Sequence, residues 1–304
     1  MIVLNSLFPI FTLILLGNLL YRYGITNKTF LDTSDRLVYY IFFPIMLFWK
    51  ISGTSNGGGI DWNFCLAALS AILVMFVLST LAIKLLRVSA FKAGSFSQSC
   101  YRFNTYIGMA VVLNSLGEEG VRHFGILVGL AIPMINVFAV SLLIWFSGEQ
   151  LSFQKRSMVL LKALISNPLI LGCVAGILYS RTIQTFPVFI ENSLQLVSMV
   201  TLPLALISIG GALTFTGLKN HLNLSLAAST LKLLVLPVIG YSLFQAFNVA
   251  GIPFKVGMIF FTLPASTAIY VLSSQLNSDT ELASASIVLS TVLSFISLSF
   301  ALLL

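Results

Sequence analysis

The chain has 304 residues, of which 58% are hydrophobic and 8% are charged, and its mean hydropathy is +1.02. This apolar share is well above that of a soluble domain, so the composition excludes an ordinary soluble protein and predicts an integral membrane protein. The net charge of +7 does not require a nucleic-acid partner, because the basic residues follow a membrane topology.

Ten hydrophobic segments follow one another along the chain, each long enough to cross a bilayer with about 20 residues. The first, residues 1–20, has no Lys or Arg and no small-residue cleavage site, so we expect a transmembrane helix and not a signal peptide. The sequence therefore predicts an all-α membrane protein with ten transmembrane helices, centred near Leu13, Pro44, Val74, Ile107, Asn136, Val174, Pro203, Leu234, Ser266 and Leu293.

The basic residues are distributed unequally between the two sides of this arrangement. With loops assigned alternately, four fall on one side, Lys50, Arg122, Arg181 and Lys255, and Arg102 stays inside a span. The other eleven are Arg22, Lys28, Arg36, Lys84, Arg87, Lys92, Lys155, Arg156, Lys162, Lys219 and Lys232. By the positive-inside rule this larger set faces the cytoplasm, which predicts a multi-pass protein of the cell (inner) membrane with both termini outside the cytoplasm.

Residues about 160 positions apart match in type along the chain. Matching positions include Pro9 with Pro168, Gly17 with Gly176, Arg22 with Arg181, Leu37-Val38 with Leu196-Val197, Pro44 with Pro203, Asn104 with Pro264, and Val111 with Val271. The shared prolines and the common offset argue against chance matching of apolar residues. We therefore expect two five-helix repeats, residues 1–148 and 149–304, and the odd number of crossings makes the second inverted.

Two segments carry residues that a continuous transmembrane helix avoids. The stretch 99–108 places Arg102, Asn104 and Gly108 in mid-span, and the stretch 262–267 places Pro264 among hydroxyl side chains. Polar groups in hydrocarbon are costly, and proline removes a helix hydrogen bond. Both helices, the fourth and the ninth, are therefore predicted to be broken. If the breaks cross, two helix N-termini point at one site, where their positive potential suits an anion.

This crossing supplies the candidate substrate site. Asn104 is placed to donate its amide to a carboxylate. Arg102 allows two interpretations, attraction of the anion or donation to carbonyls freed by the break. For Asn136 the alternatives are substrate contact and an interhelical hydrogen bond worth about 1 kcal/mol. The candidate substrate-binding residues are Arg102, Asn104, Thr105, Asn136, Pro264, Ser266 and Thr267, and Gly108 and Pro264 are the structural crossover residues.

The positions of the acidic, histidine and cysteine residues argue against a catalytic site. All nine acidic residues lie at span ends or in loops, so no carboxylate is expected at mid-membrane to carry a proton or sodium ion. His123 and His221 lie in or near loops and are expected to be solvated, while Cys65, Cys100 and Cys173 are expected to be buried thiols. These patterns predict a protein that is not an enzyme and needs no cofactor or metal.

Residues 102–108, Arg-Phe-Asn-Thr-Tyr-Ile-Gly, look like the fourth-span signature of bacterial permeases of the auxin efflux carrier family, relatives of the plant PIN carriers. Asn104 resembles the asparagine that meets the substrate carboxylate in those carriers, and Leu263-Pro264 resembles their ninth-span crossover. Asn136 falls where plant members place a substrate-contacting glutamine. The resemblance covers essentially the whole chain except a long cytosolic loop of many plant members. A proline that plant members have after Gly108 is absent here, so the substrate need not be auxin.

The resemblance implies an elevator fold like that of NhaA-type antiporters and bile-acid symporters. Helices 1, 2, 6 and 7 would form the scaffold, helices 3–5 and 8–10 the transport domain, and helices 2 and 7 a homodimer contact. We expect the function to be potential-driven export of a small organic anion or carboxylate, because an anion leaving a negative interior gains about 2.3 kcal/mol per 100 mV. The alternatives are a proton-coupled, malate- or malonate-like carboxylate transporter and a channel or sensor on the same fold.

Overall fold

The structure is a computed structural model that describes residues 1–52, 60–146, 167–183, 185–213 and 218–304. Within these ranges the chain forms helices and no strands. The predicted boundary between the two repeats, at residues 148 and 149, lies outside the described residues. The helices are α1 (Ile2–Arg22), α2 (Lys28–Leu37), η1 (Val38–Phe42), α3 (Phe43–Ser52), α4 (Trp62–Leu85), α5 (Ala90–Tyr101), α6 (Thr105–Phe146), α8 (Pro168–Thr182), α9 (Val188–Ala212), α10 (Leu218–Thr230), η2 (Leu231–Val235), α11 (Leu236–Ala246), α12 (Gly251–Thr262), α13 (Ala268–Gln275) and α14 (Thr280–Leu303).

Six described helical segments are long and apolar enough to cross a membrane: Ile2–Arg22, Trp62–Leu85, Ala90–Phe146, Val188–Ala212, Leu218–Ala246 and Thr280–Leu303. Several of the other predicted crossings correspond to shorter or interrupted helices. One of the six, Ala90–Phe146, is too long for a single crossing, and Gly117 within it has non-helical backbone angles (φ 65°, ψ −155°). The protein is thus an all-helical, multi-pass membrane protein.

Polar residues set the starts of several helices. Asn27 and Asp61 accept hydrogen bonds from the backbone N–H groups of Phe30 (2.9 Å) and Phe64 (3.0 Å), which begins α2 and α4. Asp279 caps α14 in the same way. A side-chain oxygen at this position satisfies an N–H that has no partner within the helix, so these residues fix where each helix begins.

Two π-helical turns interrupt otherwise regular helices, and each lies just before a proline. The turn η1 precedes Pro44, and η2 precedes Pro237. Proline has no N–H to donate to the carbonyl four residues earlier, so regular α-helical bonding fails at both places. Two of the prolines that interrupt the hydrophobic spans therefore also give these helices their irregular turns.

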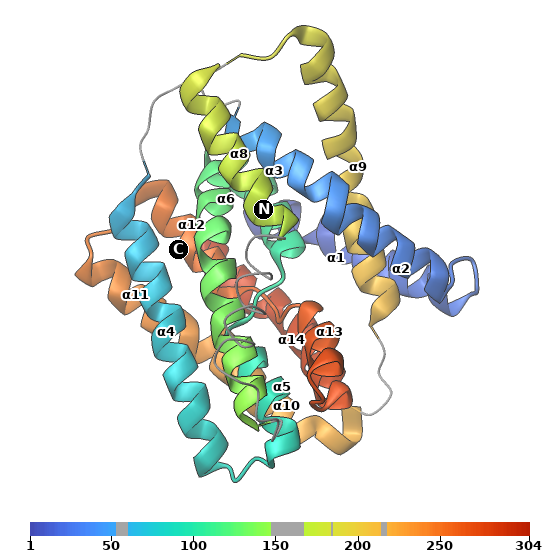
Figure 1. The fold of residues 1–304 in the computed structure, drawn as a ribbon, viewed down its shortest axis with the longest axis vertical. Helices are drawn as coiled ribbons and strands as arrows, with labels where there is room; N and C mark the ends of the chain where they lie inside the picture. Colours follow the sequence, from blue (N-terminus) through green and yellow to red (C-terminus); the bar gives the residue numbers. More distant parts are fainter. Residues whose placement is uncertain (53–59, 147–166, 184, 214–217) are drawn as a thin grey trace.

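The helices gather into two groups (Figure 1). One group contains α1, α2, α3, α8 and α9, and the other contains α4, α5 and α10–α14, with α6 running between them. Within the first group, α1 packs against α9, and α8 packs against α3. The first and second halves of the sequence therefore contribute one helix each to both pairs.

Glycines allow these two pairs to approach closely. A Cβ atom on Gly17 of α1 would lie 2.1 Å from the backbone oxygen of Ile207 in α9. A Cβ atom on Gly172 of α8 would lie 2.6 Å from the backbone oxygen of Pro44 in α3. Contacts between small residues let transmembrane helix backbones pack closely, which is how such helices associate without a hydrophobic driving force.

Candidate functional site

The two predicted interruptions meet in space. The helix α5 ends at Tyr101, residues 102–104 are non-helical, and α6 begins at Thr105. In the other segment α12 ends at Thr262, and α13 begins only at Ala268. The backbone N–H of Asn104 donates to the carbonyl oxygen of Pro264 at 2.9 Å. One hydrogen bond thus ties the two breaks together at the point where they cross.

The local geometry explains why glycine and proline occur at the crossover positions 108 and 264. A Cβ atom on Gly108 would lie 2.4 Å from Phe124 Cζ and 2.6 Å from Leu263 Cδ1, so only glycine lets the first turn of α6 pass this close. Pro264 has no N–H that a helix would need to satisfy, and its carbonyl is free to accept from Asn104. The crossing therefore requires these residue types.

Asn104 performs a structural task that the sequence did not reveal. Its side-chain oxygen accepts from the backbone N–H groups of Tyr106 and Ile107, both at 3.1 Å, and so caps α6. The residue is 2% exposed. Two of the N–H groups expected to face a ligand are therefore occupied, and the Asn104 amide nitrogen is the part of the side chain that takes no part in the cap.

Residues outside the crossing hold the second break in place. The hydroxyl of Ser290 in α14 accepts from the backbone N–H of Ala265 at 3.0 Å. The hydroxyl of Ser297, also in α14, donates to the carbonyl of Thr262 at 3.0 Å. These two could not be selected from the sequence among the many serines, because their role depends on which helix lies beside the break.

The guanidinium of Arg102 is held by two side-chain oxygens. It donates to Gln98 Oε1 at 2.9 Å through Nη1 and to Asn136 Oδ1 at 2.6 Å through Nη2. These two hydrogen bonds do not go to the freed backbone carbonyls that one of the two interpretations required. Asn136 lies 34 residues further along the chain, and its oxygen orients the Arg102 guanidinium beside the crossing.

A cavity of about 820 Å³ lies at the crossing, a size typical of small-molecule sites. Pro264 is not part of its lining. The other six predicted substrate residues line it together: Arg102, Asn104, Thr105, Asn136, Ser266 and Thr267. Further lining residues that the sequence did not indicate include Lys28, Asp35, Arg36, Tyr39, Asn167 and Tyr270. Those from α2 were missed because hydropathy places that polar helix in a loop.

Asp35 of α2 is an acidic residue of the cavity wall that makes a hydrogen bond to another helix. It accepts a hydrogen bond from the hydroxyl of Ser208 in α9 at 2.5 Å. The residue itself is exposed, but the protein around its carboxyl displaces water and so raises the pKa of that carboxyl above its ordinary value; the Ser208 hydrogen bond lowers the pKa, and the nearby charge of Asp32 raises it. Asp35 therefore takes up a proton more readily than an aspartate surrounded only by water does.

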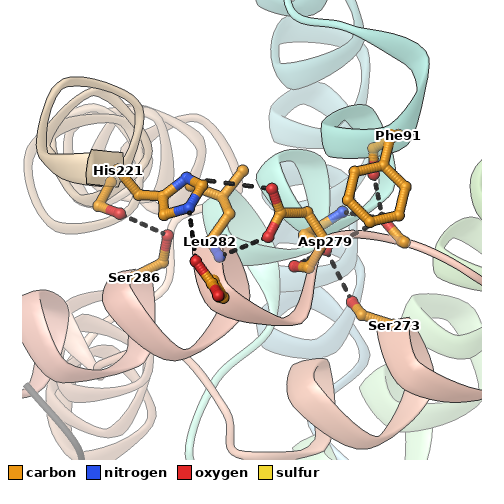
Figure 2. Close-up of polar contacts among 10 residues, drawn as sticks. Phe91, His221, Ser273, Asp279, Leu282 and Ser286 are labelled. Carbon is orange, nitrogen blue, oxygen red and sulfur yellow. Dashed lines mark hydrogen bonds and ion pairs between the residues drawn. The ribbon is translucent and has the colours of Figure 1, made fainter. Parts of the chain in front are cut away.

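Two predictions about basic residues were wrong. His221, expected to be solvated, is only 8% exposed and lies between two carboxylates (Figure 2). Its Nε2 is 3.4 Å from Glu281 Oε2, and its Nδ1 is 4.0 Å from Asp279 Oδ2, so it connects α10 to the start of α14. Lys232, counted among the loop charges, is fully buried in η2. Neither residue lines the cavity.

The described residues contain no group of three or more His, Cys, Asp or Glu side chains able to hold a metal ion. The three cysteines are all buried and free. Within the described part of the chain, the polar groups that line the cavity are Arg102, amides, hydroxyls and aromatic hydroxyls, together with the charged residues Lys28, Asp32, Asp35 and Arg36 of α2. This set can bind and orient a polar solute.

Comparison with known proteins identifies the family to which the chain belongs. A family model described as a membrane transport protein matches residues 2–302. A protein of Methanocaldococcus jannaschii named as an uncharacterized transporter is 25% identical over 302 residues, which is 97% of this chain and 96% of that protein. The chain therefore belongs to the membrane transport protein family of auxin efflux carrier-like transporters.

Proposed function

We propose that this transporter carries a small organic anion, a carboxylate, across the cell membrane. The observation that carries the proposal is the hydrogen bond from Asn104 to Pro264, which brings two helix starts together at a cavity that Arg102 also lines. Helix starts carry a partial positive charge, and an arginine adds a full one. A carboxylate is the solute class that this combination favours.

The position of Arg102 supports an anion as the ligand. The two hydrogen bonds of its guanidinium described above go to the neutral oxygens of Gln98 and Asn136 and not to a carboxylate, so they orient its charge but do not neutralise it. A guanidinium also has more donors than these two contacts use. An anion in the cavity would supply the missing countercharge, and Asn104 could add the donor that its capping role leaves over.

We further propose ten crossings arranged as two inverted five-helix repeats. The support is the pairing in the first helix group, where α1 packs on α9 and α8 packs on α3. Each pair joins a helix from the first half of the sequence to a helix from the second half. In this proposal α1, α2–α3, α8 and α9 form a scaffold, which includes the proposed homodimer contact of the second and seventh spans, and the remaining helices move as an elevator. The side rich in Lys and Arg faces the cytoplasm, with both termini on the opposite side of the inner membrane.

The direction follows from the membrane potential. A monovalent anion that leaves a negative interior gains about 2.3 kcal/mol per 100 mV, so export needs no coupled ion. The test is efflux of a panel of mono- and dicarboxylates from proteoliposomes at potentials set with potassium and valinomycin. Flux should rise as the interior is made more negative and should saturate with substrate. Flux that ignores the potential would contradict uniport, and flux that never saturates would indicate a channel.

Asp35 is the specific observation that favours the second candidate, proton-coupled carboxylate transport. Its carboxyl faces the same cavity, and its pKa is raised. A carboxyl with a raised pKa can bind a proton in step with an anion, because the two negative charges otherwise repel.

A pH gradient separates the two candidates, with Asp35→Asn as the variant and Glu191→Gln, at an exposed position of α9 outside the cavity lining, as its control. If transport is proton-coupled, a pH gradient alone drives flux in the wild type and in Glu191→Gln but not in Asp35→Asn. Potential-driven uniport predicts that none of the three proteins responds to a pH gradient alone.

A further inference from the structure

Lys232 stands out because a charged side chain inside a membrane protein is costly and usually functional. It is fully buried, at 0% exposure, in the π-helical turn η2. Among the described residues no carboxylate forms an ion pair with it. Its Nζ donates a hydrogen bond to the backbone carbonyl of Phe261 at 3.4 Å. A hydrogen bond this long to a single carbonyl does not by itself explain a lysine at this place.

The position of Phe261 in the fold suggests why a lysine lies next to its carbonyl. Phe261 is the second-last residue of α12, which stops at Thr262 because of the break. The last carbonyls of a helix have no partner within it, and together they carry a partial negative charge. In α12 the hydroxyl of Ser297 satisfies the carbonyl of Thr262, and the ammonium group of Lys232 lies at the carbonyl of Phe261. Lys232 thus places its amino group at the negative end of the broken helix.

In ion-coupled carriers with discontinuous helices, the C-terminal end of a half-helix has a binding function. There, unwound backbone carbonyls and the C-terminal ends of half-helices bind the coupling sodium ion or proton, while half-helix N-termini face the anionic substrate. In this chain the N-termini of α6 and α13 border the cavity, and the C-terminal end of α12 faces Lys232. The substrate side and the cation side of the crossing are therefore distinct.

We propose that Lys232 is a tethered cation. Its ammonium group supplies, from η2, the positive charge that a bound sodium ion supplies at the equivalent helix end of ion-coupled carriers. It acts as a positioning residue: it stabilises the end of α12 and thereby the carbonyl of Pro264 that binds Asn104. The part that concerns transport rests on the function proposed above, whereas the replacement of a bound cation by Lys232 does not.

The first measurement uses the wild-type protein and no substrate. Its melting temperature in detergent should be the same in sodium chloride and in N-methylglucamine chloride at equal ionic strength. A rise in sodium of several degrees would overturn the proposal, because the protein would then bind a cation that the lysine should replace.

The second measurement replaces the lysine by serine, which removes the charge and leaves space and a hydroxyl group for a sodium ion. Lys232→Ser should melt lower than the wild type and should regain about 3 °C in 100 mM sodium if the new site binds it with a Kd near 10 mM. The matched control is Lys255→Ser, which removes an exposed lysine from the same α12 near its other end and should show no sodium-specific shift. A sodium response no larger in Lys232→Ser than in Lys255→Ser would overturn the proposal.

A third pair covers the case in which the serine variant does not fold. Lys232→Arg keeps the charge and should fold and transport, whereas Lys232→Met keeps the bulk without the charge and should lose stability and flux. Methionine that performs as well as lysine would overturn the proposal. These outcomes remain distinct from failure of the carboxylate proposal, since a wild type that carries no carboxylate leaves the sodium shift of Lys232→Ser intact.

Discussion

Asn104 has two chemically different ends, and the fold uses its oxygen. That oxygen accepts the N–H groups of Tyr106 and Ile107, while the backbone N–H of the same residue binds Pro264. A residue that caps a helix and joins two breaks is hard to replace, even before any ligand is considered. Loss of transport on mutation at this position would therefore not by itself identify a binding residue.

Two substitutions separate the roles of Asn104. Asn104→Ala removes the cap and should cost about 1 kcal/mol of folding stability together with carboxylate binding. Asn104→Asp keeps an oxygen that can cap α6 but replaces the amide donor by a negative charge. It should melt close to the wild type and show no carboxylate-dependent rise in melting temperature. An aspartate variant that carboxylates stabilise as strongly as the wild type would show that the amide does not bind them.

Among the elements, the broken helices were the most predictable. Arg102 and Asn104 are too costly for an unbroken span facing lipid, and Pro264 cannot continue one, so the type and place of each residue predicted both interruptions. The partners of the breaks could not be predicted in this way. Ser290 and Ser297 resemble other serines of α14 in sequence, and only the packing of that helix beside α12 selects them.

The two close helix pairs are also set by single residues. Gly210 of α9 would place a Cβ atom 1.9 Å from the backbone oxygen of Ile14 in α1, and Gly172 of α8 faces Pro44 of α3 with similar closeness. Because backbone cannot move aside cheaply, Gly210→Ala and Gly172→Ala should each destabilise the protein by about 1–3 kcal/mol. Similar losses at both sites would support equivalent roles for the two pairs.

A control for these glycine variants is Val200→Ile, which adds one methyl group at an exposed position of α9. It should leave the melting temperature unchanged, since Val200 is half exposed, whereas Gly210 is packed against backbone. If Gly210→Ala melts like Val200→Ile, the close approach of α1 and α9 is not required for stability.

At the scale of the whole molecule, an ion pair joins the first helix group to α6, which moves with the second group in the proposed elevator. Lys50, near the end of α3, contacts Glu118, which follows the non-helical Gly117 within α6. In the proposed topology this contact lies at the extracytoplasmic end of the molecule, whereas the α2 residues of the cavity wall lie toward the cytoplasm. Exposed pairs contribute about 0–1 kcal/mol, so this contact can bias a conformational equilibrium but cannot lock it.

A covalent link at the same place would lock it, and this tests the elevator motion directly. In the double variant Lys50→Cys, Glu118→Cys, a short bifunctional maleimide should join the two groups and abolish carboxylate flux, because the moving helices must separate from the scaffold there. The native cysteines Cys65, Cys100 and Cys173 are buried and should react slowly. Each single variant treated with the same reagent should keep its flux. Full flux in the cross-linked double variant would mean that the helix groups do not separate at this contact during transport.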